Sequence, residues 1–291
     1  MMTNQELVQV VCREIRAEHH RTYLPFTLED GEPGLLDSKV GGTPYLPRDM
    51  AWPRDREGTP LDFLAQVDCA RLSALPGLPH TGLLQFFIGT NKLYGSGFGD
   101  MAREEKAVLW HTETDPTVTA AEVEAKRPPA PEERYSPLEG GPCAIRFGDP
   151  AEQGMTSGDF RFGPLFVEKW NRENPGQPIK SFWDVFELLP EAEDDEDEEA
   201  IDRLFEEDQG EEETPRHQVG GYPYFTQSDP RERENEDLDT LLFQLDSDAL
   251  EAGRGQWRVL WGDCGVANFF LRGEALKNRD FSRVMYNWDC C

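Results

Sequence analysis

Two carboxylates share one face of an expected strand. In "DTLLFQLDSD", alternation places Asp246 and Asp248 on the same side of the chain. Carboxylates so placed could bind a divalent cation or act as an acid/base pair. Asp263, in "WGDCG", is a third carboxylate that could join them, but no His lies nearby in sequence to complete a triad. The alternative is turn capping, a frequent role of Asp near strand ends.

Amide side chains occur at matched places in two parts of the chain. Gln66 and Asp68 lie in "PLDFLAQVD", and Gln85 lies in "GLLQFFIG". Gln244 precedes the carboxylate pair, and Asn268 lies in "GVANFFL". We predict that these residues form a ligand- or partner-binding site together with Asp246, Asp248 and Asp263. The alternative is that they satisfy backbone groups of nearby turns.

The elements that carry these side chains occur twice. "VGGTPY" at residues 40–45 returns as "VGGYPY" at residues 219–224. Each copy is followed by Gln-x-Asp and then by an apolar run with Phe-Phe. The constant order predicts an internal duplication, with units at 38–111 and 217–291. Paired glycines allow backbone angles that other residues avoid, so the motif predicts the turn that begins each unit.

The predicted fold class is α+β. We expect two mainly antiparallel sheet units related by a pseudo-twofold axis, so that the matched amides and carboxylates converge near it. An N-terminal helix precedes them, because Thr3 and Glu6 fit a capping box before an amphipathic run. We expect a single domain over 1–291. Its parts are the helix and lead-in (1–37), the first unit (38–111), connecting strands and a helix (112–190), an acidic insertion (191–213) and the second unit (217–291).

The chain of 291 residues has a net charge of −28. Residues 191–213 hold 15 Asp or Glu and one Arg, which predicts a solvated, disordered insertion. Such a charge disfavours general nucleic-acid binding, because phosphate backbones are bound through basic surfaces. It would attract a basic protein partner and speed their encounter.

The sequence lacks a complete motif for zinc or for a dinucleotide cofactor. The six cysteines show no Cys-x-x-Cys spacing, so no zinc site is predicted, and no residue is assigned as a metal ligand. Gly97, Gly99 and Ala102 fit Gly-x-Gly-x-x-Ala, but a dinucleotide fingerprint must open a helix, and here another strand follows. We therefore predict no cofactor. No apolar segment is long enough to span a membrane and no signal peptide is evident, so we expect a cytoplasmic protein.

The repeated motifs together resemble a known family. "SKVGGTPYLP", "GLLQFFIG", "GGYPYFTQSDPR", "LLFQLDSD" and "DFSRVMYNWDCC" are similar to the YwqG-like family, a bacterial family of unknown function. The resemblance covers the chain from about residue 38 to its end. It implies an α+β fold with an internal duplication. Members near polymorphic-toxin genes suggest an immunity role, and the family brings no established catalytic residues.

Charge and resemblance together favour a binding function. We expect a cytoplasmic interaction protein, and within that class an immunity protein that neutralises a basic toxin. No complete catalytic signature is present, so we favour a protein that is not an enzyme. The alternative is a metal-dependent or hydrolase-like enzyme that uses carboxylates at the repeat interface. A third hypothesis is a nucleic-acid mimic that uses its acidic face.

Overall fold

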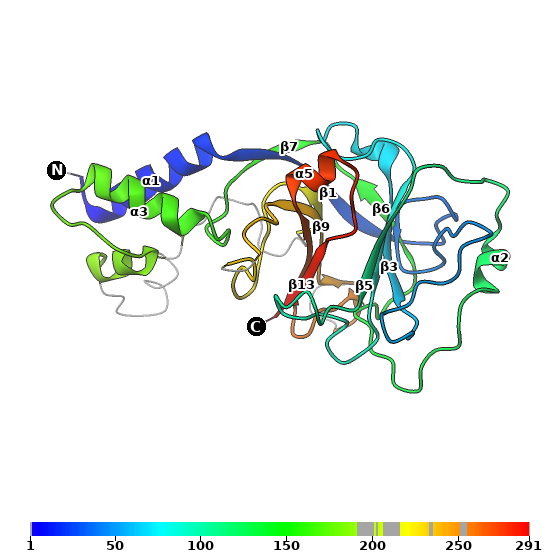
Figure 1. The fold of residues 1–291 in the computed structure, drawn as a ribbon. Coiled ribbons are helices and arrows are strands. Elements are labelled where there is room, and N and C mark those ends of the chain that lie inside the picture. The colour runs from blue at the N-terminus through cyan, green and yellow to red at the C-terminus, as the bar shows by residue number, and fades with distance from the viewer. Residues whose placement is uncertain are drawn as a thin grey trace.

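The computed structural model describes residues 2–190, 201, 203–205, 216–232, 235–250 and 255–290. Most of the acidic insertion expected at 191–213 lies outside these residues. The two long helices lie at one end of the molecule, where α1 (Asn4–Glu18) packs on α3 (Phe162–Glu173) (Figure 1). The capping box predicted at Thr3 and Glu6 is confirmed, because each side chain accepts the other residue's backbone N–H. The remaining helical elements are short: η1 (Cys69–Leu72), α2 (Ala120–Glu124), η2 (Phe182–Leu188) and α5 (Gly273–Lys277).

One antiparallel sheet of eleven strands dominates the rest. Its strand order is β13-β12-β9-β8-β1-β6-β2-β3-β4-β5, and β7 also pairs with β1. The first arm, as we call it, contains β2 (Lys39–Val40), β3 (Asp62–Asp68), β4 (Leu83–Ile88) and β5 (Lys106–His111). The second arm contains β8 (Gln218–Gly220), β9 (Thr240–Asp246), β12 (Val266–Leu271) and β13 (Met285–Asp289). Between the arms run β1 (His20–Asp30) and β6 (Cys143–Phe147), with β7 (Ala151–Gly154) beside β1, while β10 (Asp248–Ala249) and β11 (Trp257–Val259) form a separate small sheet.

The predicted α+β fold of two duplicated units is wrong. The structure is mostly one large antiparallel sheet that curls into a nearly closed barrel, and only 19% of it is helical. The repeated motifs do lie in separate arms, but the arms are joined through β1 and β6, which belong to neither predicted unit. A repeated motif dictates a local turn and strand pair. The longer connections decide which strands complete the sheet.

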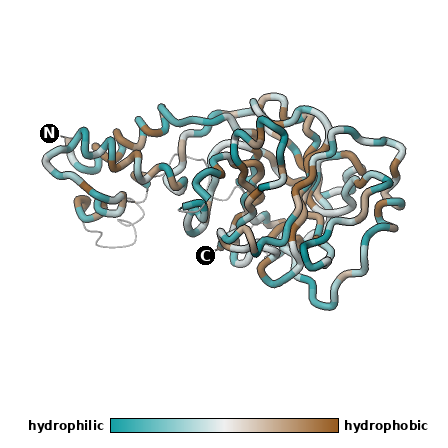
Figure 2. The backbone as a smooth tube through the Cα atoms, in the orientation of Figure 1, coloured by the Kyte–Doolittle hydropathy of each residue, from teal (hydrophilic) through white to brown (hydrophobic). Residues whose placement is uncertain are grey.

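The main core lies between the two arms, where a group of aromatic rings packs among Leu, Val and Ile side chains. Phe86 of β4 stacks on Phe243 of β9, with ring centroids 4.5 Å apart, and lies 4.8 Å from Phe269 of β12. All three side chains are fully buried. Figure 2 shows the apolar segments concentrated along these strands, with hydrophilic loops around them. Burial of these large rings is therefore one of the contacts that hold the arms together.

Asp289, at the end of β13, is a buried carboxylate that makes stability depend on pH. Burial raises the pKa of Asp289 to about 6, although backbone donors such as the Gln227 N–H (2.7 Å) partly oppose the shift. The folded-state pKa lies above the unfolded one. Wild-type stability therefore falls as the pH rises from the unfolded pKa to the folded pKa of about 6. We expect Asp289→Asn to lack this dependence. Its stability relative to wild type should rise by about 1 kcal/mol between pH 5 and pH 8 in urea unfolding. A difference that does not change with pH would contradict the prediction.

Candidate functional site

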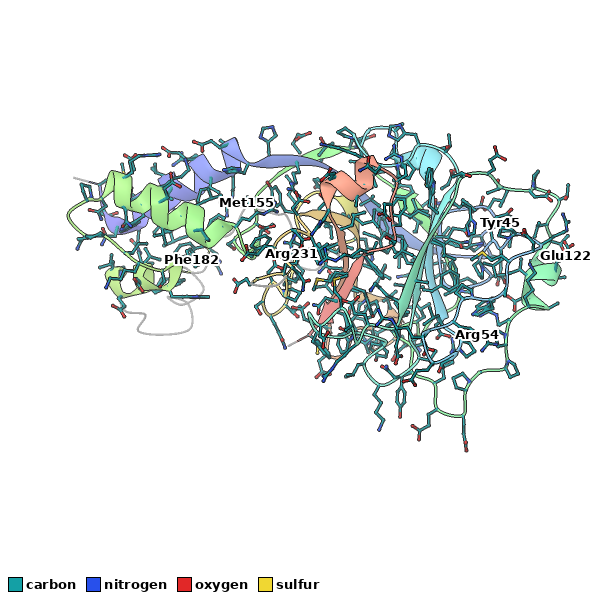
Figure 3. The ribbon with its side chains drawn as sticks, viewed as in Figure 1. Tyr45, Arg54, Glu122, Met155, Phe182 and Arg231 are labelled. Atoms are coloured by element: carbon teal, nitrogen blue, oxygen red, sulfur yellow. The ribbon has the colours of Figure 1, made fainter. Side chains whose placement is uncertain are left out.

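The amides of the first arm fasten the turn of its Val-Gly-Gly motif. Gln66 Oε1 accepts the Tyr45 N–H (3.0 Å) and a bond from Gln85 Nε2 (2.7 Å). Gln85 Nε2 also donates to the Tyr45 carbonyl (2.7 Å). Both amides are fully buried and face each other across β3 and β4. Tyr45 lies at the opposite end of the molecule from α1 and α3, on the side of α2 (Figures 1 and 3). These two residues thus satisfy backbone groups, as their alternative interpretation predicted.

The second arm repeats this arrangement. Gln244 Oε1 accepts the Tyr224 N–H (2.8 Å), and Asn268 Nδ2 donates to the Tyr224 carbonyl (2.9 Å). Gln244 and Asn268 are register partners on β9 and β12 and are fully buried. The matched Gln and Asn positions therefore fix the same backbone turn in both arms.

The two sets of amides are not brought together. Strand alternation sends Phe86 and Phe269 into the shared core, so their neighbours Gln85 and Asn268 point to the opposite face of the sheet. Among the described residues, no hydrogen bond joins one set to the other. The convergence expected near a twofold axis is therefore not what these amides do.

His217 contacts both Asp246 and Asp248, which the structure places at the end of β9 and in β10, and not on the face of a single strand as predicted. The Asp246 N–H donates to His217 Nδ1 (3.0 Å), so the ring proton sits on Nε2, 3.3 Å from Asp248 Oδ2. Burial raises the pKa of Asp246, opposed by N–H donors from Arg216 and Ser247. His217 was missed because it lies about 30 residues earlier in the chain. A signal existed, since it occupies the place that Ser38 holds before the first motif, and Ser38 Oγ likewise accepts an N–H, from Asp68 (2.8 Å).

From Asp248 a chain of charges leads to the surface. Arg258 Nη1 donates to Asp248 Oδ1 (3.1 Å), and Arg258 Nε donates to Asp30 Oδ1 (2.7 Å). The bond from Arg258 lowers the pKa of Asp30. Asp30 is exposed at the end of β1, so the buried His217 and Asp248 hold a surface carboxylate in place through one arginine.

Asp30 opens onto an acidic groove of about 510 Å³. Its charged residues are five carboxylates, from Glu29, Asp30, Glu32, Asp37 and Asp68, and two guanidinium groups, from Arg71 and Arg146. Glu29 is paired with Arg146 (2.7 Å), and Asp30 is paired with Arg258. Among the described residues, the other three carboxylates have no basic side chain within ion-pair distance.

The predicted site residues therefore separate into four groups. Asp68 lines the acidic groove and also accepts the Ala70 N–H (3.0 Å). Asp246 and Asp248 lie behind the groove, bound to His217 and, for Asp248, Arg258. Asp263 is exposed on a turn after β11 and does not join them. The four amides hold the turns: Gln66, Gln85, Gln244 and Asn268.

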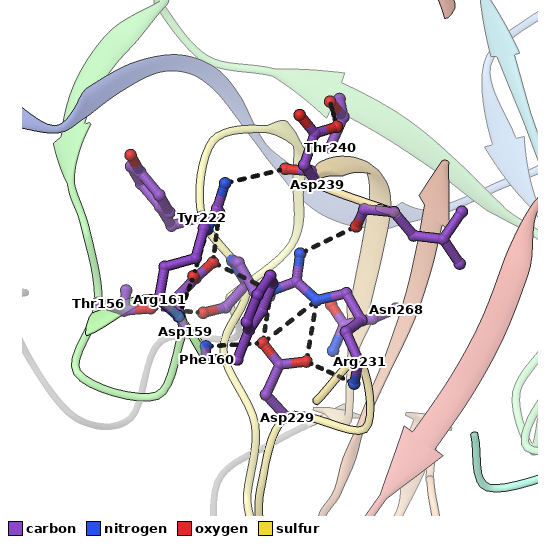
Figure 4. Close-up of polar contacts among 12 residues, drawn as sticks. Thr156, Asp159, Phe160, Arg161, Tyr222, Asp229, Arg231, Asp239, Thr240 and Asn268 are labelled. Carbon is purple, nitrogen blue, oxygen red and sulfur yellow. Dashed lines mark hydrogen bonds and ion pairs between the residues drawn. The ribbon is translucent and has the colours of Figure 1, made fainter. Parts of the chain in front are cut away.

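A second polar cluster, which sequence reasoning missed, lies between the helical end and the sheet (Figures 3 and 4). Arg231 is fully buried and bonds to both Asp229 (2.5 Å) and Asp159 (3.0 Å). Arg161 forms a two-pronged pair with Asp159 (2.6 and 2.7 Å). Burial would raise the pKa of Asp159, but the bonds from Arg161 and the charge of Arg231 outweigh it, and the pKa is lowered. The cluster ties residues 159–161, just before α3, to the 229–231 loop.

Comparison with known families gives one match. A family described as a domain of unknown function, DUF1963, matches residues 38–290, which is most of the chain. The chain belongs to the DUF1963 family. The match supports the resemblance to a family of unknown function, while the YwqG-like name stays an expectation. No curated protein matches the chain.

The DUF1963 match includes both arms, the acidic groove except its Glu29–Asp37 side, and the Arg231 cluster. It leaves out α1 and β1, although β1 pairs with β6, β7 and β8. Within the part of this DUF1963 protein that the structure describes, no group of three or more His, Cys, Asp or Glu side chains is arranged to hold a metal ion. Among its described helices, none has the length and apolarity that crossing a membrane would need.

Proposed function

We propose that this chain binds a basic protein partner, and that the acidic groove forms part of the contact surface. The observation that carries the proposal is the charge of the groove, where five carboxylates face two arginines. A partner with a basic patch would be steered to such a surface, and the like charges would repel acidic partners. The net charge of −28 adds a long-range attraction for the same basic partner.

The groove offers charge that is available and held in place. Glu32, Asp37 and Asp68 are the three carboxylates without a basic partner among the described residues. Asp37 accepts the Gly34 N–H (2.7 Å) and Asp68 accepts the Ala70 N–H (3.0 Å), so backbone contacts already orient both side chains. Less conformational entropy is then lost when a lysine or arginine of the partner binds.

Within this class, the finer proposal is an immunity protein. A strongly acidic surface suits the occlusion of a basic active site, such as that of a nuclease or ribosyltransferase toxin. The resemblance to proteins encoded near polymorphic toxins supports the same role. The partner would then be a toxin encoded beside this protein in the same genome.

The test is co-expression with such a toxin, followed by affinity measurements on a catalytically inactive form of it. Wild type should restore growth and form a stable complex. Glu32→Lys combined with Asp37→Asn removes two negative charges and adds one positive charge, a net change of three units, and keeps a side-chain acceptor at position 37. We expect about tenfold weaker binding at low salt, chiefly through slower association. The difference should shrink as the ionic strength is raised.

The matched control is Glu132→Lys combined with Glu133→Gln. It makes the same change in net charge at two exposed residues that do not line the groove. This variant should bind almost as wild type does. Equal weakening by both variants would show that only net charge matters and remove the groove from the proposal. An absence of both rescue and complex would sink the immunity role.

A further inference from the structure

A second cavity, of about 440 Å³, lies where the two arms meet. The first arm contributes the loop before β5, and the second arm contributes the segment that leads into β13. Its charged residues are Arg56, Lys106, Arg283 and Asp100. Three cations against one carboxylate is unusual for a chain that carries a net charge of −28. The lining of this cavity is therefore positively charged, although the protein as a whole is negatively charged.

Ion pairs around the cavity leave its positive charge in excess. Asp237 is shared between Arg283 (2.7 Å) and Arg272. Asp100 pairs with Arg103 (3.4 Å), and Lys106 pairs with Glu104, whose side chain is fully buried behind it. Arg56 has no carboxylate within ion-pair distance among the described residues and donates to the Ala102 carbonyl (2.9 Å). These cations outnumber these carboxylates by five to three: Arg56, Arg103, Lys106, Arg272 and Arg283 against Asp100, Glu104 and Asp237.

The loop that lines the cavity is held in a shape that few sequences adopt. Phe98 has φ +48° and Gly99 has φ +91°, both in the left-handed region. A Cβ at Gly97 would lie 2.1 Å from the Asp100 carbonyl oxygen, so no larger residue fits there. Asn235 of the second arm donates to the Gly99 carbonyl (2.9 Å), and Arg56 holds the other end of the loop. The cavity is thus preformed by contacts from both arms.

We propose that this cavity binds a small molecule carrying a phosphate monoester. The guanidinium groups of Arg56 and Arg283 present forked donors that match phosphate oxygens, and Lys106 adds a point charge. Met101 and Val284 give the organic part of the ligand an apolar wall, while Ser282 is hydrogen-bonded to Asp280. A cavity of this size suits a small metabolite better than a macromolecule.

This site differs from the nucleotide fingerprint that the glycines suggest in sequence. Gly97, Gly99 and Ala102 belong to a loop that leads into β5 and opens no helix, so no helix N-terminus faces a phosphate. The anion is held by side-chain cations, and the glycines shape the loop.

The experiment is titration calorimetry of the full chain with glycerol 3-phosphate and with inorganic phosphate, using glycerol as the uncharged control. Wild type should bind both phosphates saturably and should not bind glycerol. Binding should be stronger at pH 8 than at pH 5.5, because the second phosphate proton is lost in this range. We expect Arg56→Gln combined with Arg283→Gln to weaken phosphate binding at least tenfold.

The control is Arg13→Gln, together with thermal unfolding of each variant without ligand. Arg13 is exposed on α1 and does not line the cavity, so its loss should leave phosphate affinity unchanged. An unaltered affinity in the folded double variant would place the anion elsewhere and overturn the proposal. So would an absence of saturable phosphate binding by wild type. Binding of inorganic phosphate without glycerol 3-phosphate would rule out a monoester ligand.

Discussion

Arg231→Met is expected to lower the free energy of unfolding by about 3–5 kcal/mol, the usual consequence of removing one partner from a buried ion pair. Arg231 is fully buried and is the residue that bonds to both Asp229 and Asp159. Methionine would fill much of the same volume between Phe160 and Phe270, which the guanidinium now stacks on. The loss would therefore come from two carboxylates left with fewer donors, and only to a small extent from packing. Equilibrium unfolding in guanidinium chloride would measure this loss of free energy.

Arg272→Met provides the matched control, because it is the same substitution at a surface ion pair. The Arg272 side chain is 54% exposed and shares Asp237 with Arg283. Such pairs contribute about 0–1 kcal/mol, so the control should unfold close to wild type. If both variants lost the same small amount, the Arg231 cluster would be no more important than a surface pair. Retained stability in Arg231→Met would equally contradict the prediction.

Phe86→Ala is expected to cost about 3–5 kcal/mol, because it opens a cavity between the two arms. The Phe86 ring is fully buried against Phe243 and Phe269, at 4.5 and 4.8 Å between ring centroids. No neighbouring strand can move in to refill the space without breaking the sheet register. The midpoint of thermal or urea unfolding should fall sharply, and the variant should expose apolar surface to a hydrophobic dye.

The same substitution at Phe98 serves as the comparison. Phe98 is 52% exposed at the tip of a loop, so its removal should change the free energy of unfolding by about 0.5 kcal/mol or less. A Phe86→Ala loss as small as that of Phe98→Ala would mean that the arms are held together by something other than their aromatic interface.

Local structure could be predicted from the sequence because the relevant signals are local. The helix at 4–18 follows from a capping box and an apolar stripe, and both are confirmed. Alternation around Gln66 and Gln244 predicted strands, which are now β3 and β9. The overall architecture depended on β1 and β6, whose apolar and polar residues give no indication of which strands they will join. The α+β prediction failed at that step.

The candidate site could be predicted only in part, for a related reason. Asp68 and Asp246 were recognised because they end matched strands, and Asp248 because it follows Asp246 by two residues. Asp246 and Asp248 bond to His217, and Asp68 lines the acidic groove. Arg258 bonds to Asp30 and Asp248, and Arg231 bonds to Asp159 and Asp229. Nothing in the sequence around either arginine marks it out. Their roles come from burial and from partners far along the chain, and a single sequence does not reveal such contacts.

The position of β1 has a consequence for how this family is delimited. Sequence similarity begins at residue 38, but the strand that bridges β6 and β8 ends at Asp30. A polypeptide trimmed to the similar region would keep both arms and lose the strand between them. Two rows of unpaired backbone groups would then be open to pairing with another chain. The folded sheet is therefore larger than the region matched by the family, and the strand outside that region, β1, lies in the middle of the sheet.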